Sequence, residues 1–167
     1  MVEPSESLKQ VFEQAIELAK EYKHEYLTIE HVLFAMFNNE NFVNTIQSFG
    51  ADSDYIKKNV EHYLKTKLDD IVKEDVSKPK KTQALERVLN RAFTQSLFNG
   101  RQTMELTDVF ISIMGEKRSF ASYYIQQAGV DKNKFSDYLS NLKLENIGYM
   151  VFLSIYKKIN INLYYLI

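Results

Sequence analysis

The sequence predicts an all-α protein: a duplicated four-helix repeat of about eight helices, related by a pseudo-twofold axis. Three observations lead to this prediction. The 167 residues include only 5 glycines and 2 prolines, so few residues interrupt helices. Apolar residues recur at steps of three and four, which is the spacing of one helix face. The same apolar pattern then returns 77 residues later, as Leu8 and Leu85 illustrate.

The first repeat, residues 5 to 65, begins with a well-marked amphipathic helix. Pro4 and the serines at positions 5 and 7 suit its opening turn. Its apolar stripe is predicted to comprise Leu8, Val11, Phe12, Ala15, Ala19 and Tyr22.

Thr28 precedes a second apolar run, from Val32 to Phe37. Its hydroxyl oxygen is predicted to cap the N-terminus of that helix, an interaction typically worth about 1 kcal/mol. Glu30, in the first turn, suits the positive end of the helix dipole.

Two further helices, residues 42 to 49 and 52 to 65, complete the first repeat, with Gly50 between them. The charged stretch TKLDDIVKEDVSKPKK, residues 66 to 81, is predicted to be an exposed linker. The second repeat is then expected over residues 82 to 144, within a domain that covers residues 1 to 145.

Two features indicate duplication: the repeated apolar pattern and the repeated position of a helix-breaking glycine. A shift of 77 residues sets Val11 against Val88 without a gap, and the glycine of GAD at 50 to 52 returns in GVD at 129 to 131. Asn38 similarly meets Gly115, and both residue types tolerate the left-handed turn that ends many helices. One unit of about 60 residues buries too little surface alone, so the two are expected to share a core.

The tail, residues 146 to 167, changes character abruptly to NIGYMVFLSIYKKININLYYLI. Lys157 and Lys158 in mid-span weigh against a transmembrane helix, which needs about 20 mostly apolar residues. Two interpretations stay open: a truncated or out-of-frame end, or an extra helix or hairpin that closes an apolar groove.

Composition bounds the function. Lys+Arg of 21 against Asp+Glu of 22 provides no basic field for a nucleic acid. The absence of cysteine and of a signal-peptide pattern makes a cytoplasmic location the simplest expectation. The sequence has no GxxxxGK[ST], GxSxG or HExxH motif, so neither ATP hydrolysis nor another catalytic activity is expected from it, and no cofactor.

The stretch HEYLTIEH, residues 24 to 31, raises the question of a metal site. His24, His31 and Glu25 could form a small metal-dependent enzyme site, but no motif with metal-ligand spacing accompanies them. A helix cap with surface contacts explains the segment more simply, so no physiological metal is expected.

The segments EYKHEYLTIEHVLFAMFNN in the first half and RVLNRAF in the second resemble the N-terminal domains of ClpA-type AAA+ unfoldases, over residues 5 to 142. ClpC-type domains usually carry glycine where this chain has Leu27, which favours the ClpA branch. The resemblance implies a monomeric docking module that binds the ClpS adaptor and substrate proteins, for ATPase rings that work with ClpP. A ClpC-type or ClpB-type module with another partner is the alternative.

The resemblance also implies the adaptor-binding residues, which are Glu25, Glu30, Thr82, Arg87, Val88 and Arg91. Arg87 and Arg91 are four residues apart, so they are neighbours on one helix face and can hold a partner carboxylate between them. Val88 is in tension with the duplication, which assigns it to the core stripe, whereas the resemblance implies a surface position.

Overall fold

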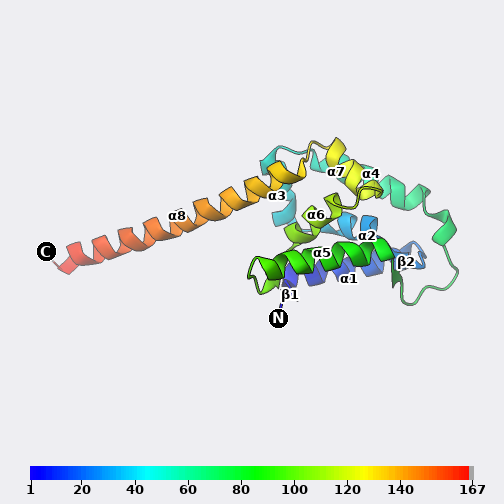
Figure 1. The fold of residues 1–167 in the computed structure, drawn as a ribbon, viewed down its shortest axis with the longest axis horizontal. Coiled ribbons are helices and arrows are strands. Elements are labelled where there is room, and N and C mark those ends of the chain that lie inside the picture. Colours follow the sequence, from blue (N-terminus) through cyan, green and yellow to red (C-terminus); the bar gives the residue numbers. More distant parts are fainter. Residues whose placement is uncertain (166–167) are drawn as a thin grey trace. The chain divides into compact units, whose positions relative to one another are not determined.

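The computed structural model describes the backbone of residues 1–165 and the side chains of residues 1–160. This part of the chain contains eight α-helices, which confirms the all-α prediction, and four two-residue strands (Figure 1). The helices are α1 (Glu6–Glu21), α2 (Ile29–Met36), α3 (Glu40–Phe49), α4 (Ser53–Thr66), α5 (Gln83–Phe98), α6 (Leu106–Met114), α7 (Phe120–Gln127) and α8 (Lys132–Tyr165). The strands are β1 (Glu3–Pro4), β2 (Tyr26–Leu27), β3 (Lys80–Lys81) and β4 (Thr103–Met104).

Residue contacts divide the chain into two compact units, Met1–Val130 and Asp131–Ile167. The first unit contains α1 to α7, and its main helix pairs are α1 with α2 and α5 with α6. The predicted domain end near residue 145 stays a prediction.

The duplication is visible in the positions of the elements. Helix α5 begins and ends 77 residues after α1, at Gln83 and Phe98 against Glu6 and Glu21. The buried positions keep the same offset, because the set in α1 is repeated residue for residue in α5: Leu8, Val11, Ala15 and Ala19 against Leu85, Val88, Ala92 and Ser96. The two apolar stripes therefore occupy equivalent positions in the core.

The short strands tie the two halves to each other. β1 pairs with β4 and β2 pairs with β3, both in parallel, so β1 and β2 near the first repeat join β4 of the second repeat and β3 at the end of the linker. The sequence pattern did not predict these strands, because two residues are too few to show a period. The β2–β3 pair brings the end of the linker beside the start of α2.

Helix caps repeat as well. Gly50 ends α3 with φ 96°, and Gly129 follows α7 with φ 92°, so the two predicted breakers share the left-handed conformation. The next helix is capped in each half by an aspartate, since Asp52 accepts from Tyr55 N–H and Asp131 from Lys134 N–H.

The expected left-handed turn at Asn38 and Gly115 is wrong. Gly115 has φ −78°, and Asn38 is not among the described residues with positive φ. Helices α2 and α6 end instead with carbonyls of the last turn accepting from several following N–H groups, such as Gly115 N–H to Ser112 O at 3.0 Å.

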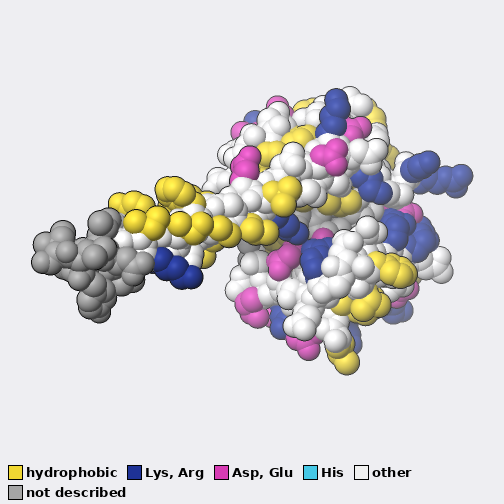
Figure 2. All heavy atoms as spheres, turned by 60° about the vertical axis from the view of Figure 1, so that its left-hand side comes forward, with side chains coloured by type: hydrophobic (Ala, Val, Ile, Leu, Met, Phe, Trp, Pro, Cys, Tyr) yellow, Lys and Arg dark blue, Asp and Glu magenta, His cyan; other side chains and the backbone are white. Residues whose placement is uncertain are grey.

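Helix α8 continues through residue 146 without a break, so the tail is helical as far as Tyr165 and forms no hairpin there. Its exposed apolar side chains cover the stretch from Leu144 to Ile159 (Figure 2). Within the described residues, no helix combines the length and apolarity that crossing a membrane requires.

Candidate functional site

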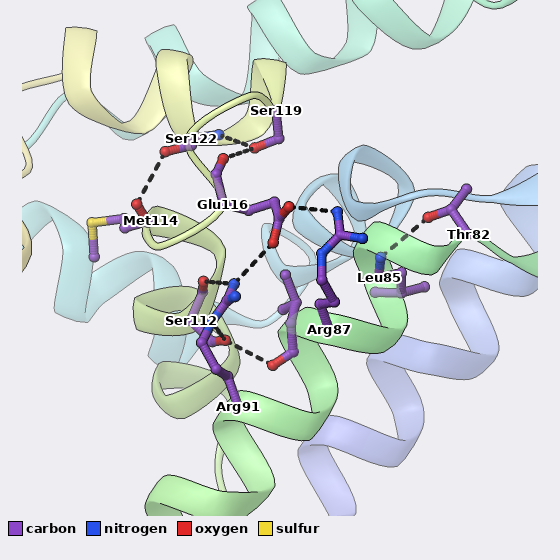
Figure 3. Close-up of polar contacts among 10 residues, drawn as sticks. Thr82, Leu85, Arg87, Arg91, Ser112, Met114, Glu116, Ser119 and Ser122 are labelled. Atoms are coloured by element: carbon purple, nitrogen blue, oxygen red, sulfur yellow. Dashed lines mark hydrogen bonds and ion pairs between the residues drawn. The ribbon is translucent and has the colours of Figure 1, made fainter.

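The two arginines of α5 converge on one carboxylate, that of Glu116 (Figure 3). Arg87 Nη2 donates to Glu116 Oε1 at 2.7 Å, and Arg91 Nη2 donates to Oε2 at 3.1 Å. The sequence predicted that these two guanidinium groups can hold a carboxylate of a partner, and that stays a prediction. The carboxylate, however, comes from the chain itself, in the turn between α6 and α7. We call Arg87, Arg91 and Glu116 the arginine clamp.

The clamp is open to solvent on its cationic side. The side chains of Arg87 and Arg91 are 55% and 43% exposed, whereas that of Glu116 is 14% exposed. Hydrogen bonding to Arg87, reinforced by Arg91, lowers the pKa of the Glu116 carboxyl against the opposing effect of burial. The same hydrogen bond raises the pKa of Arg87, so both partners are charged at neutral pH.

The C-terminal turn of α6 holds Arg91 in place. Arg91 Nη2 also donates to the carbonyl of Ser112 at 3.0 Å, and its Nε lies 3.3 Å from Ser112 Oγ. That hydroxyl in turn donates to the carbonyl of Val88 at 2.7 Å. Gly115 adjoins this contact, because a Cβ there would lie 3.3 Å from the Ser112 carbonyl oxygen and 3.4 Å from Arg91 Nε.

Val88 itself is fully buried, with 0% of its surface exposed. The surface position that the resemblance implied for its side chain is therefore wrong, and the core position given by the duplication is right. A valine between two exposed arginines points inward because positions one residue apart on a helix face different directions.

Thr82 and Glu25 lie at the beginning of α5. The Thr82 hydroxyl caps the helix by accepting from Leu85 N–H at 3.2 Å, and Thr82 N–H donates to Leu27 O at 3.1 Å. Glu25 joins the same region, because its carbonyl accepts from Lys80 N–H at 2.9 Å. Its carboxylate is 4.0 Å from the Lys73 ammonium and about one third exposed, at 32%.

Glu30 is not a solvated surface charge, because it is only 6% exposed. Its Oε1 accepts from Ala121 N–H at 3.2 Å, in the first turn of α7. A carboxylate is favourable there because it meets the unpaired N–H groups and the positive end of the helix dipole. Ser119, the cap of α7, also donates from its hydroxyl to the carbonyl of Glu116 at 3.0 Å. Glu30 thus supports the segment that carries the clamp carboxylate.

The two histidines of HEYLTIEH form a buried hydrogen-bonded pair. Thr28 N–H donates to His31 Nδ1 at 3.0 Å, so that nitrogen carries no proton and the proton of neutral His31 is on Nε2. His31 Nε2 then donates to His24 Nδ1 at 2.8 Å. Burial, followed by the neighbouring His24, lowers the pKa of His31 to about 3, and burial also lowers the pKa of His24. Thr28 caps α2 as predicted.

This arrangement leaves little for a metal to bind. The two facing nitrogens are joined to each other, and the remaining nitrogen of His31 is taken by the backbone. Glu25 points its carboxylate toward Lys73. Across the residues whose side chains are described, no group of three or more His, Cys, Asp or Glu could hold a metal ion.

Sequence reasoning missed Glu116 and Ser112. Glu116 follows the end of α6 and is 29 residues from Arg87, so no helical spacing connects them. Only the packing of α5 against α6 brings them together. The paired arginines were the available signal that a carboxylate should lie nearby.

Comparison with known proteins identifies the family. The family model for the Clp repeat N-terminal domain matches residues 3–128. A ClpA homolog protein from Fuscovulum blasticum is 27% identical over 124 residues, which are 74% of this chain and 16% of that protein. The chain therefore spans about one sixth of this curated relative.

Solved structures share the fold at low identity. The Hsp104 N-terminal domain from Candida albicans superposes with a TM-score of 0.70 at 12% identity, over 84% of this chain and 91% of that one. A ClpV N-domain in complex with a VipB peptide gives 0.62 at 19% identity, over 80% and 88%. With the family model covering most of the chain and the duplicated helical fold in agreement, this chain belongs to the Clp repeat N-terminal domain family.

Proposed function

We propose that this chain is the adaptor- and substrate-docking module of a ClpA-type AAA+ unfoldase, and that it binds the ClpS adaptor. In that role the adaptor delivers proteins with destabilising N-terminal residues, ATPase rings outside this chain unfold them, and ClpP degrades them, all in the cytoplasm. The observation that carries the proposal is the arginine clamp, a preorganised and half-exposed cationic pair on a Clp repeat fold.

The clamp can bind a partner without being dismantled. A guanidinium has five N–H donors, and Arg87 uses only Nη2 for Glu116. A partner carboxylate can therefore take the remaining donors while Glu116 keeps both arginines extended. Because each exposed ion pair is worth only about 0.2 to 1 kcal/mol, these charges would orient the adaptor more than they would tighten its binding.

The other predicted residues then have different roles. Glu25, partly exposed beside the start of α5, presents the opposite sign to a partner. Thr82 fixes the first turn of α5. Val88 and Glu30 act indirectly, since the first holds the Ser112 hydroxyl and the second supports the turn that carries Glu116.

Titration of the chain with purified ClpS tests the proposal. Arg87→Gln should weaken binding by up to about fivefold, as the loss of one exposed ion pair allows. Arg87→Glu, which adds repulsion of the partner carboxylate, should abolish binding, with the melting temperature and helicity nearly unchanged because the side chain is exposed. Lys57→Glu, an exposed charge reversal on α4, is the control and should bind like the parent chain. Unchanged affinity of Arg87→Glu would refute the site.

The parent titration also separates the alternatives. If the chain does not bind ClpS but captures aggregated protein or another adaptor, it is a ClpC-type or ClpB-type module. The relation of its fold to Hsp104 and ClpV domains is the observation that favours this second candidate. Stoichiometric metal on elemental analysis would instead revive the metal-dependent enzyme at His24 and His31.

A further inference from the structure

A groove of about 460 Å³ lies between α1 and α2, and its lining residues include none from the clamp elements α5 and α6. Leu18, Phe34 and Ala35 provide its apolar lining. Leu18 and Phe34 are partly exposed, although both helices bury their other faces in the core.

The α1 side of this groove is acidic. Glu13, Glu17 and Glu21 line it, and they succeed one another at steps of four, so they form one row along the helix. Lys20 pairs with Glu17 at 2.8 Å. Glu13 and Glu21 have no ion pair within the part of the chain whose side chains are described.

The duplicated half shows what such a groove can hold. The residue 77 positions after Gln14, a lining residue, is Arg91, and the residue 77 positions after Ala35 is Ser112. In the second half Arg91 donates to the carbonyl of Ser112. This carbonyl accepts from Gly115 N–H as well, just as that of Ala35 accepts from Asn38 N–H. The first half therefore has the same carbonyl but no arginine of its own.

We infer that the groove between α1 and α2 binds an arginine-bearing segment of a partner protein, in the way that α6 receives Arg91. The guanidinium would donate to Ala35 O and to the glutamates of α1, and a neighbouring apolar side chain would cover Leu18 and Phe34. The negative rim requires a basic occupant, since the approach of carboxylates would be repelled. This surface is separate from the clamp and gives the module a second docking site.

The probe is a fluorescein-labelled helical peptide of about 15 residues with two arginines four residues apart and a leucine on the same face. Fluorescence anisotropy should show saturable binding that weakens as salt rises. Replacing Glu13, Glu17 and Glu21 together by Gln should weaken binding at least tenfold. Peptides with glutamine in place of arginine should bind at least tenfold more weakly.

A second variant fills the groove from within. Gln14→Arg combined with Asn38→Gly copies Arg91 and Gly115 into the first half, at two exposed positions, and should abolish peptide binding with helicity retained. Glu74→Lys in the linker is the charge control and should bind normally.

Three results would overturn the inference. They are equal affinity of the glutamine peptide, normal binding by the filled groove, or self-association of the chain that the glutamine triple variant abolishes in sedimentation equilibrium. The last result would identify a second copy as the occupant. ClpS binding through the clamp should be unaffected by all these groove variants, so failure here is distinguishable from failure of the proposed function.

Discussion

The two halves of the molecule place different chemistry at equivalent positions. His24 and His31, the latter in the first turn of α2, form a neutral buried pair. The residues 77 positions later, Arg101 and Asp108, form an ion pair at the first turn of α6. Arg101 donates to both carboxylate oxygens of Asp108, at 2.6 and 2.8 Å. Each second member also completes a capping box, His31 with Thr28 and Asp108 with Glu105. Both halves therefore have a hydrogen-bonded polar pair at this position, neutral in the first half and charged in the second.

The ends of α2 and α6 differ in the same way. In the first half Asn38 Nδ2 donates to Gln14 Oε1 at 3.3 Å and an open groove remains. In the second half the equivalent residues are Gly115 and Arg91, and the arginine occupies the space. The core positions are therefore alike in the two halves. The exposed positions differ, and in our proposals they form two docking surfaces, the arginine clamp and the groove between α1 and α2.

The largest expected effect concerns the histidine pair. Because its pKa is about 3 in the folded chain and 6.5 ordinarily, His31 takes up a proton on unfolding at acidic pH. The stability that neutral His31 contributes to the folded state is fully present above pH 6.5 and is lost as the pH falls toward 3. Between pH 7 and 5 the free energy of unfolding should fall by about 2 kcal/mol from this group, with a slope that approaches about 1.4 kcal/mol per pH unit only at the acidic end of this range.

Urea unfolding of the parent chain and of His31→Gln, compared across pH, measures the contribution of His31 to the free energy of unfolding. Glutamine at the third helical position is a normal capping-box partner for threonine, so the variant keeps its cap but does not titrate. His62→Gln, at an exposed histidine, is the control for the loss of a histidine side chain. Parallel curves for the parent and His31→Gln would show that the pair does not titrate as proposed.

The glycine pair tests the equivalence of the halves. Gly50→Ala and Gly129→Ala should each cost about 1 kcal/mol, because both have positive φ and an added Cβ meets nothing within 4 Å. Gly115→Ala should cost less, since its φ is −78° and the added Cβ meets only the Ser112 carbonyl oxygen closely, at 3.3 Å, while Arg91 stays at ordinary contact distance. Thermal denaturation measures all three, and very unequal costs at 50 and 129 would argue against a shared turn.

The smallest effect is that of the clamp on stability. Glu116→Gln should lower the free energy of unfolding by less than about 1 kcal/mol at pH 7, since its arginine partners are exposed. The pKa of Glu116 is lowered, so its contribution is present above the ordinary carboxyl pKa and disappears as pH falls through the folded value. Urea midpoints of the parent and variant should move closer as the pH falls below the ordinary carboxyl pKa; Glu86→Gln, at an exposed position on the same helix as the arginines, is the charge control. A gap that does not narrow as the pH falls would exclude the ionic origin.

The sequence alone determined the helical class, the register of 77 residues and the Thr28 cap, because these depend on local spacing and on side chains near their own backbone. The paired arginines could be picked out for the same reason, since helix neighbours are four residues apart.

Only the tertiary structure decided what those residues face. Glu116 meets Arg87 and Arg91 through the packing of α5 on α6, and Glu30 meets the start of α7, 91 residues away. Val88 could be assigned to the surface or the core until its burial was known. Such contacts join segments that are distant in the sequence. The sequence pattern predicts which helix faces are apolar, but it does not predict which polar group of another segment will contact them.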